Sequence, residues 1–126
     1  MRVMVVDDEE DVIELFKQRF RKEIQTHSIE FVFEHSAEAA LTTLTKNGQL
    51  DAVLILSDIN MPGMSGLELL RILKESNKNI KVIMVTAYED DENYQKAMNY
   101  GADGFINKPI DFTALKEKIY IVAEDN

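Results

Sequence analysis

The stretch Val53-Leu54-Ile55-Leu56-Ser57-Asp58 is an apolar run that ends in a hydroxyl and a carboxylate. Three other apolar runs also lead into polar residues: 3–6 before Asp7-Asp8, 82–85 before Thr86, and 104–107 before Lys108-Pro109. Near-continuous apolar segments of this length are typical of strands buried on both faces of a parallel sheet. Because parallel strands end at one edge of a sheet, we expect these polar residues to gather in one crevice.

Strand-like runs alternate with amphipathic stretches along the whole chain. Strands are predicted at residues 2–6, 29–34, 53–57, 80–85 and 104–107. The second of these has the fewest apolar residues and is expected at an edge of the sheet. Right-handed crossovers between consecutive parallel strands place helices on both faces. The sequence therefore predicts an α/β fold with five βα units.

The five stretches between and after these strands have apolar residues at helical spacing. The second helix is expected to be capped by Ser36, and the third opens with the capping-box spacing of Ser65 and Glu68. The fourth, at about residues 90–99, is the least apolar and ends at Gly101. The apolar positions are Val12, Ile13, Phe16, Phe20 and Ile24 in the first helix, Ala37, Ala40, Leu41 and Leu44 in the second, Leu67, Leu70 and Leu73 in the third, Tyr94, Ala97 and Met98 in the fourth, and Phe112, Leu115, Ile119 and Val122 in the fifth.

Length and composition limit the classes of protein to consider. The 126 residues suit one domain, residues 1–126, with one ordinary core. A net charge of −9 disfavours direct nucleic-acid binding, and no apolar run approaches the roughly 20 residues that cross a bilayer. The chain has no cysteine and begins directly with a strand, without a leader, so we expect a cytoplasmic protein with no membrane partner.

The expected crevice has the composition of a magnesium-assisted phosphoryl-transfer site. Asp58 is the candidate nucleophile, although its loop sequence also suits a simple cap. Asp7 and Asp8 are the candidate metal ligands with Asp58, because each pair of carboxylates about 4 Å apart repels by about 4 kcal/mol without a cation. Mg²⁺, or Mn²⁺ as an alternative, would relieve this repulsion, with the backbone carbonyl of Asn60 completing the protein ligands.

Other residues around the crevice have two interpretations each. Lys108 offers an ammonium to the phosphoryl group or a salt bridge to Asp58. Thr86 offers a hydroxyl to the phosphoryl oxygens or simply suits a strand. Phe105 is either a core aromatic or a rotamer switch that moves with Thr86. Residues 9–11, which continue the acidic run, are interpreted as a solvated helix start.

Four segments together resemble the receiver domain of two-component response regulators, the CheY-like family. They occur in the order and spacing of that family and span the whole chain. They are Val5-Val6-Asp7-Asp8-Glu9, the string from Ser57 to Gly66, Thr86-Ala87, and the stretch from Gly101 to Pro109.

The resemblance implies a flavodoxin-like, doubly wound (βα)5 fold with strand order 2-1-3-4-5. It also implies that Asp58 accepts a phosphoryl group from a sensor histidine kinase or a histidine phosphotransfer protein, with Mg²⁺ bound by Asp7, Asp8 and Asp58. Lys108 and Thr86 would contact the phosphoryl oxygens, and the Lys108-Pro109 bond would be cis. Asn60 and Tyr88 are positions that vary in the family and are expected to tune the lifetime of the phosphate.

Phosphorylation is expected to change one surface of the domain. Thr86 would bond the new phosphoryl group, and Phe105 would fill the space that it leaves. The surface formed by the fourth helix, the fifth strand and the fifth helix would then change and bind an output domain, another effector or a second copy.

Three other functions use the same fold class. A small phosphatase with an aspartate nucleophile needs an acid two residues later, where this chain has Asn60. A flavin- or nucleotide-binding module needs a glycine-rich or hydroxyl-rich loop after the first strand, where the acidic run 7–11 would repel phosphate. A non-catalytic interaction domain has no need for three acids and a lysine in one crevice.

Overall fold

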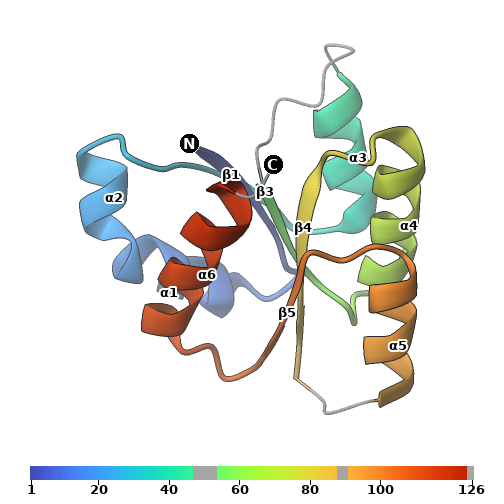
Figure 1. Ribbon diagram of the computed structural model, residues 1–126. Coiled ribbons are helices and arrows are strands. Elements are labelled where there is room, and N and C mark those ends of the chain that lie inside the picture. The colour runs from blue at the N-terminus through green and yellow to red at the C-terminus, as the bar shows by residue number, and fades with distance from the viewer. Residues whose placement is uncertain (47–53, 88–90, 125–126) are drawn as a thin grey trace.

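The computed structural model describes residues 1–46, 54–87 and 91–124. Strands and helices alternate along this part of the chain (Figure 1). None of the described helices is long and apolar enough to cross a bilayer. The elements are β1 (Arg2–Val6), α1 (Glu10–Arg19), α2 (Arg21–Gln25), β2 (Glu30–Glu34), α3 (Ala37–Thr45), β3 (Leu54–Asp58), α4 (Gly66–Ser76), β4 (Lys81–Thr86), α5 (Asp91–Asn99), β5 (Gly104–Asn107) and α6 (Phe112–Glu124).

The sheet has five strands in the order β2-β1-β3-β4-β5, and all four pairs are parallel. This confirms the predicted fold class, the strand order and the edge position of β2. The register aligns Val6 with Ser57, and Asp58 with Val85. The carboxyl ends of β1, β3 and β4 therefore lie side by side at one edge of the sheet.

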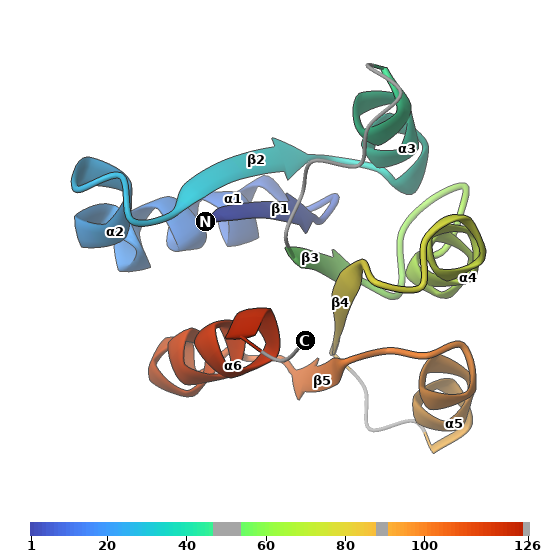
Figure 2. The same cartoon turned by 45° about the horizontal axis from the view of Figure 1, so that its top comes forward.

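Each face of the sheet is covered by its own helices. α1, α2 and α6 cover one face, and α3, α4 and α5 cover the other (Figures 1 and 2). Successive strand residues point to opposite faces, so in β1 Val3 and Val5 contribute to the first core and Met4 and Val6 to the second. This explains why the central strands are apolar between their polar ends.

The first predicted helix is interrupted at Phe20. Its backbone there has φ −104° and ψ 20°, and the chain continues as the short helix α2. The buried Phe20 ring stacks on Phe16 at 5.8 Å and meets Phe31 of β2 edge-on at 5.0 Å. The four-residue spacing of the aromatics therefore reflects a shared core, but it does not require one continuous helix.

Helix caps and helix faces agree only in part with the predictions. Ser36 and Ser65 cap α3 and α4 as expected, accepting hydrogen bonds from the third residue after each. Glu68 does not return to Ser65 as in a capping box; its carboxylate pairs with Arg71. In α5 the three apolar positions expected to form a stripe do not all face the core. Among the described residues of α5 only Ala97 is buried, whereas Tyr94 and Met98 are exposed.

Candidate functional site

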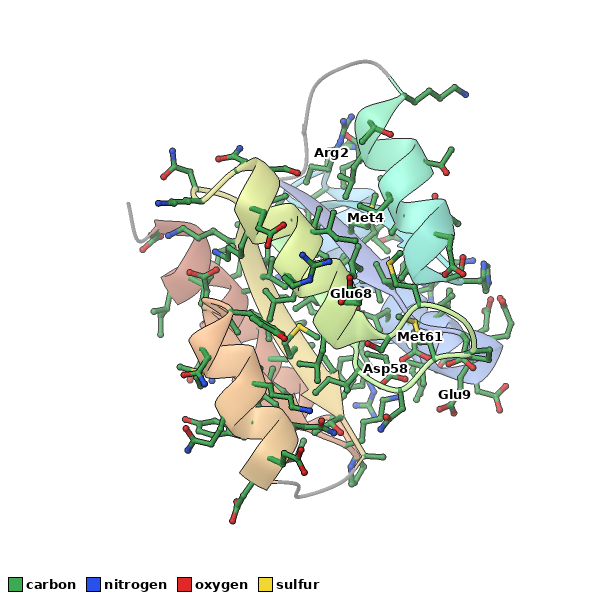
Figure 3. All side chains as sticks on the ribbon, turned by 90° about the vertical axis from the view of Figure 1, so that its right-hand side faces the viewer. Arg2, Met4, Glu9, Asp58, Met61 and Glu68 are labelled. Atoms are coloured by element: carbon green, nitrogen blue, oxygen red, sulfur yellow. The ribbon has the colours of Figure 1, made fainter. Side chains whose placement is uncertain are left out.

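The ends of four strands supply the candidate residues. Asp7 follows β1, Asp58 and Thr86 end β3 and β4, and Lys108 follows β5. Backbone hydrogen bonds fix these ends: Asp7 N–H donates to the Glu34 carbonyl at 3.0 Å, and Lys108 N–H donates to the Thr86 carbonyl at 2.7 Å. Figure 3 shows Asp58 and Glu9 at one end of the molecule, with Arg2 at the other end of β1.

Lys108 lies among three carboxylates. Its Nζ is 3.1 Å from Asp7 Oδ2, 3.3 Å from Asp58 Oδ2 and 3.5 Å from Glu9 Oε1. The Asp7 and Asp58 side chains are only 4% and 5% exposed, and that of Lys108 is 14% exposed. The salt bridge between Lys108 and Asp58 that the sequence suggested is therefore present in this state, and Asp7 shares the same ammonium.

Burial sets the charge balance of this cluster. It raises the pKa of Asp7 above its usual value, although the Glu9 N–H and the Lys108 ammonium both oppose the change. Burial also raises the pKa of Asp58; Lys108 again opposes this, and the charge of Asp7 adds to it. Burial of Lys108 disfavours its charge, but Asp7 and Asp58 outweigh that effect and raise its pKa. One ammonium is thus too little to compensate both buried carboxylates fully.

The acidic cluster fits a hard divalent cation. Asp7, Asp8, Glu9 and Asp58 each offer a carboxylate oxygen, and these oxygens all lie within 4.8 Å of one another. Oxygen-only ligands at this spacing suit Mg²⁺ or Mn²⁺ and exclude the thiolate sites of softer metals. Asp8 and Glu9 are exposed, whereas Asp7 and Asp58 are buried, so the cluster opens to solvent on one side.

Glu9 is a member of this cluster that the sequence analysis missed. It is the N-cap residue of α1, its N–H donates to Asp7 Oδ1 at 2.9 Å, and its carboxylate reaches Lys108. The interpretation of residues 9–11 as a solvated helix start holds for Glu9, which is exposed and caps α1, but its carboxylate also belongs to the cluster. The sequence did contain a signal for this: Glu9 directly follows Asp8. A helix cap this close to the end of β1 must lie beside the acidic residues that follow the strand.

The loop after Asp58 is held close to the nucleophile candidate. Asn60 is exposed, and its N–H donates to Asp58 Oδ1 at 3.4 Å. The loop closes where Gly66 N–H donates to the Ile59 carbonyl at 2.8 Å. Gly66 lies so near that an added Cβ would be 1.9 Å from the Asp58 carbonyl oxygen. Only glycine fits at this position, because the contacting atoms belong to the backbone.

Replacing Gly66 with alanine is expected to lower the free energy of unfolding by about 3 kcal/mol, the upper end of the usual cost of overpacking. The new Cβ would push α4 away from the Asp58 carbonyl, and urea unfolding would measure the loss. Gly101→Asn is the control: an added Cβ there meets nothing closer than 3.8 Å, so its cost is confined to the positive φ of 93°, which asparagine tolerates better than most residues. Equal stability of Gly66→Ala and the natural protein would contradict the close approach.

The remaining predicted residues differ in how clearly they are placed. Thr86 is fully buried at the end of β4. Phe105 is half-buried, packs against the core on the α3, α4 and α5 side, and meets Tyr94 edge-on at 5.2 Å. The Lys108-Pro109 peptide bond is cis. Tyr88 lies outside the described residues.

A family model shows which known proteins the chain resembles. The model described as "Response regulator receiver domain" matches residues 3–120. Asp7, Asp8, Asp58, Thr86 and Lys108 all lie inside this match.

Individual proteins agree with the family model. The chain is 32% identical over 130 residues to the chemotaxis protein CheY of Pseudomonas aeruginosa, covering 98% of this chain and 97% of that protein. It is 31% identical over 121 residues to chemotaxis protein CheY-3 of Vibrio cholerae, covering 94% and 88%. It also matches a cyclic di-GMP phosphodiesterase of Thermotoga maritima at 31% identity, where it spans only 30% of the relative's length.

Solved structures show the same similarity in three dimensions. A CheY-like receiver domain protein from Methanospirillum hungatei superposes with a TM-score of 0.87 at 31% identity, covering 98% of this chain and 94% of that one. The receiver domain of NtrX from Brucella abortus superposes with a TM-score of 0.84 at 26% identity, covering 98% and 99%. The acidic cluster thus lies on a fold shared with solved receiver domains. Some relatives match this chain over nearly their whole length, and others over only a part of it.

Proposed function

Because the chain belongs to the response regulator receiver domain family, we propose that Asp58 is its phosphoacceptor. The chain is a phosphoacceptor domain of two-component signalling, a switch rather than an enzyme that turns over external substrates. The observation that carries the assignment of Asp58 is its position. It is a buried carboxylate at the end of the central strand β3, within reach of both Lys108 and the acidic cluster.

The chemistry proposed at Asp58 is an in-line phosphoryl transfer. A carboxylate oxygen of Asp58 forms a bond to phosphorus as the bond from phosphorus to the donor histidine nitrogen breaks, and the imidazole keeps the electron pair. The Lys108 ammonium then pairs with the negative charge of the phosphoryl oxygens, and the Thr86 hydroxyl donates a hydrogen bond to the same group. Thr86 ends β4, the neighbour of β3, and Lys108 directly follows β5, the neighbour of β4.

Asp7, Asp8 and Asp58 are proposed to bind Mg²⁺, with the Asn60 carbonyl as a further ligand. The bound ion would supply positive charge for the transferring phosphoryl oxygens. Lys108 now occupies the position of a cation between Asp7 and Asp58, so it must move toward the phosphoryl group when those carboxylates are engaged. Glu9 can keep one contact with Lys108 during that change.

The alternative functions have less support. Asn60 stands where an aspartate phosphatase needs its acid, so turnover of external phosphate esters should be poor. The carboxylates at 7–9 lie where a flavin or nucleotide module binds phosphate. A purely structural domain does not explain two buried carboxylates with raised pKa values around one lysine.

Incubation with acetyl phosphate tests the proposal without a kinase. In the presence of Mg²⁺, intact-mass spectrometry is expected to show one added phosphoryl group, which base treatment removes because acyl phosphates are labile. With EDTA the uptake should fall close to background, because the acidic cluster then lacks its cation. No uptake at any Mg²⁺ concentration, or a base-stable phosphate, would contradict the proposal.

The surface formed by α5, β5 and α6 is the proposed output of the switch. It is the same surface that the sequence predicted; its helices are labelled α5 and α6 because the first predicted helix is split into α1 and α2. β5 is an edge strand, and a hollow of about 520 Å³ lies beside it, lined in part by Ile106, Leu115 and Ile121. Ile121 is 67% exposed. Phe105 of β5 contacts Tyr94 of α5, so a change at Phe105 would be felt on this surface.

Beryllium fluoride with Mg²⁺, a mimic of the phosphoryl group, is expected to promote self-association or effector binding through this surface. Sedimentation would show a rise in mean mass for the natural chain, whereas Asp58→Ala should not respond. Ile121→Glu should block association while leaving phosphoryl uptake intact, because it alters only the exposed surface. Equal association of the natural chain and Asp58→Ala would contradict this output.

Membership of the family implies a phosphodonor kinase as a partner. We propose a sensor histidine kinase or a histidine phosphotransfer protein as the donor, and an output domain or separate effector as the receiver of the signal. Residues 1–126 are proposed to form one domain. We propose that it acts in the cytoplasm, where a phosphodonor kinase has access to ATP.

A further inference from the structure

The loop between β3 and α4 is held by a side chain from a different helix. The middle of this loop is residues 60–64, which begin with Asn60 and include the buried Met61. Met64 N–H donates to Glu38 Oε2 of α3 at 3.4 Å. In Figure 3 this loop continues from Asp58 past Met61, below the first turn of α3.

The same carboxylate also lies directly on Gly63. A Cβ added to Gly63 would be 2.5 Å from Glu38 Oε2, so the loop backbone and the carboxylate are in close contact. Gly63 has φ 77°, a left-handed conformation that glycine adopts without strain. Glu38 therefore contacts two consecutive residues at the tip of the loop.

Glu38 itself is well positioned by local structure. It lies in the first turn of α3, whose N-cap Ser36 accepts a hydrogen bond from Ala39 N–H at 3.0 Å. The preceding strand β2 ends at Glu34, whose carbonyl accepts the hydrogen bond from Asp7 N–H. One short segment, residues 34–38, thus contacts both the loop that carries Asn60 and the backbone of the acidic residue Asp7.

We propose that Glu38 is a positioning residue for Mg²⁺ binding, which rests on the function proposed above. By accepting a hydrogen bond from the tip of the loop, it reduces the conformations open to residues 60–64 and keeps the Asn60 backbone near Asp58. A ligand held in place before binding loses less entropy when the ion arrives. Glu38 acts through the loop and is not itself a ligand.

The test is Mg²⁺ affinity, measured by titration with amide NMR of β1 and β3 without any phosphodonor. Glu38→Ala is expected to weaken Mg²⁺ binding about fivefold, the effect of losing one hydrogen bond to a carboxylate. Glu38→Gln should stay within about twofold of the natural protein, because its amide oxygen still accepts from Met64. Rescue by Gln separates positioning from the attraction of one more negative charge.

Glu117→Ala on α6 is the matched control, since it removes the same exposed charge away from the loop. It should leave Mg²⁺ affinity unchanged. Equal weakening by Glu38→Ala, Glu38→Gln and Glu117→Ala would overturn the proposal in favour of general electrostatics. If the natural protein does not bind Mg²⁺ at all, the proposed function fails; if it binds and Glu38→Ala binds equally, only this inference fails.

A double-mutant cycle gives a second, independent test. Gly63→Asn keeps the left-handed backbone accessible, because asparagine tolerates positive φ, but its Cβ would displace the Glu38 carboxylate. It should weaken Mg²⁺ binding about as much as Glu38→Ala. Since both changes break one contact, the double variant should be no weaker than either single variant. Fully additive losses would overturn the coupling between Glu38 and the loop.

Discussion

Asp58→Asn is expected to abolish phosphoryl uptake from acetyl phosphate in Mg²⁺. The carboxylate of Asp58 is the nucleophile proposed here, and an amide oxygen is far too weak to replace it. The substitution keeps the size and shape of a side chain that is only 5% exposed, so neighbouring groups need not move. Intact-mass spectrometry after saturating incubation would show the unmodified mass for this variant and one phosphoryl group for the natural chain.

The folded state of this variant can be checked at the same time. Because burial raises the pKa of Asp58, its ionised form opposes folding at neutral pH in the absence of metal. Asp58→Asn removes that charge, so its urea midpoint without Mg²⁺ should equal or exceed that of the natural protein. A folded variant that still gains one base-labile phosphate would exclude Asp58 as the phosphoacceptor.

Asp8→Asn is the companion variant for the metal. Asp8 is exposed, so its loss should leave the nucleophile and the fold intact while removing one proposed ligand. Phosphoryl uptake should be slower at low Mg²⁺ and recover as Mg²⁺ is raised, because weaker binding can be offset by concentration. The two variants thus separate the nucleophile from the metal ligands.

Much of the fold and the site could be predicted because the chemistry coincides with the ends of apolar runs. In β3, burial on both faces makes the run from Leu54 to Leu56 wholly apolar, so the Ser57-Asp58 pair that follows stands out. The crossover rule then brings the ends of separate strands together without any knowledge of side-chain contacts. Asp7, Asp58 and Lys108 meet as that argument requires.

What the sequence could not provide depends on packing between distant segments. The helix breaks at Phe20, whose ring meets Phe31 of β2, and neither the break nor this contact is encoded in the four-residue spacing. Glu9 belongs to the cluster because Lys108, 99 residues later, lies beside it. The sparse packing of α5 was foreseen from its composition, but of the apolar positions expected there, Tyr94, Ala97 and Met98, only Ala97 is buried.

Lys108→Met is expected to have a large effect on stability. It removes the ammonium between Asp7 and Asp58 while keeping a side chain of similar length. Loss of one partner from a buried charge pair typically costs 3–5 kcal/mol, and the slight exposure of Lys108 favours the lower end, about 3 kcal/mol at pH 7.5 without metal. Urea unfolding with and without Mg²⁺ would measure this loss, and Mg²⁺ should recover much of it by supplying the missing positive charge.

The pH dependence of this loss has a definite sign. Both carboxyls have pKa values raised by burial in the folded state, so their contribution to stability is fully present below the unfolded pKa, near 4, and is lost as pH rises through the higher folded pKa. Without Lys108 those folded pKa values rise further, because the nearest opposing charge is gone. The difference in unfolding free energy between Lys108→Met and the natural protein should therefore be small near pH 4.5 and grow toward pH 7.5.

An exposed lysine distinguishes this effect from the loss of any positive charge. Lys96 pairs with Glu92 at 3.3 Å on the surface of α5, where both side chains are more than half exposed. Such pairs contribute at most about 1 kcal/mol, so Lys96→Met should cost little and respond only weakly to pH and Mg²⁺. If Lys108→Met is as mild and as insensitive to pH as Lys96→Met, then Lys108 does not compensate the buried carboxylates, and the charge balance inferred for the site is wrong.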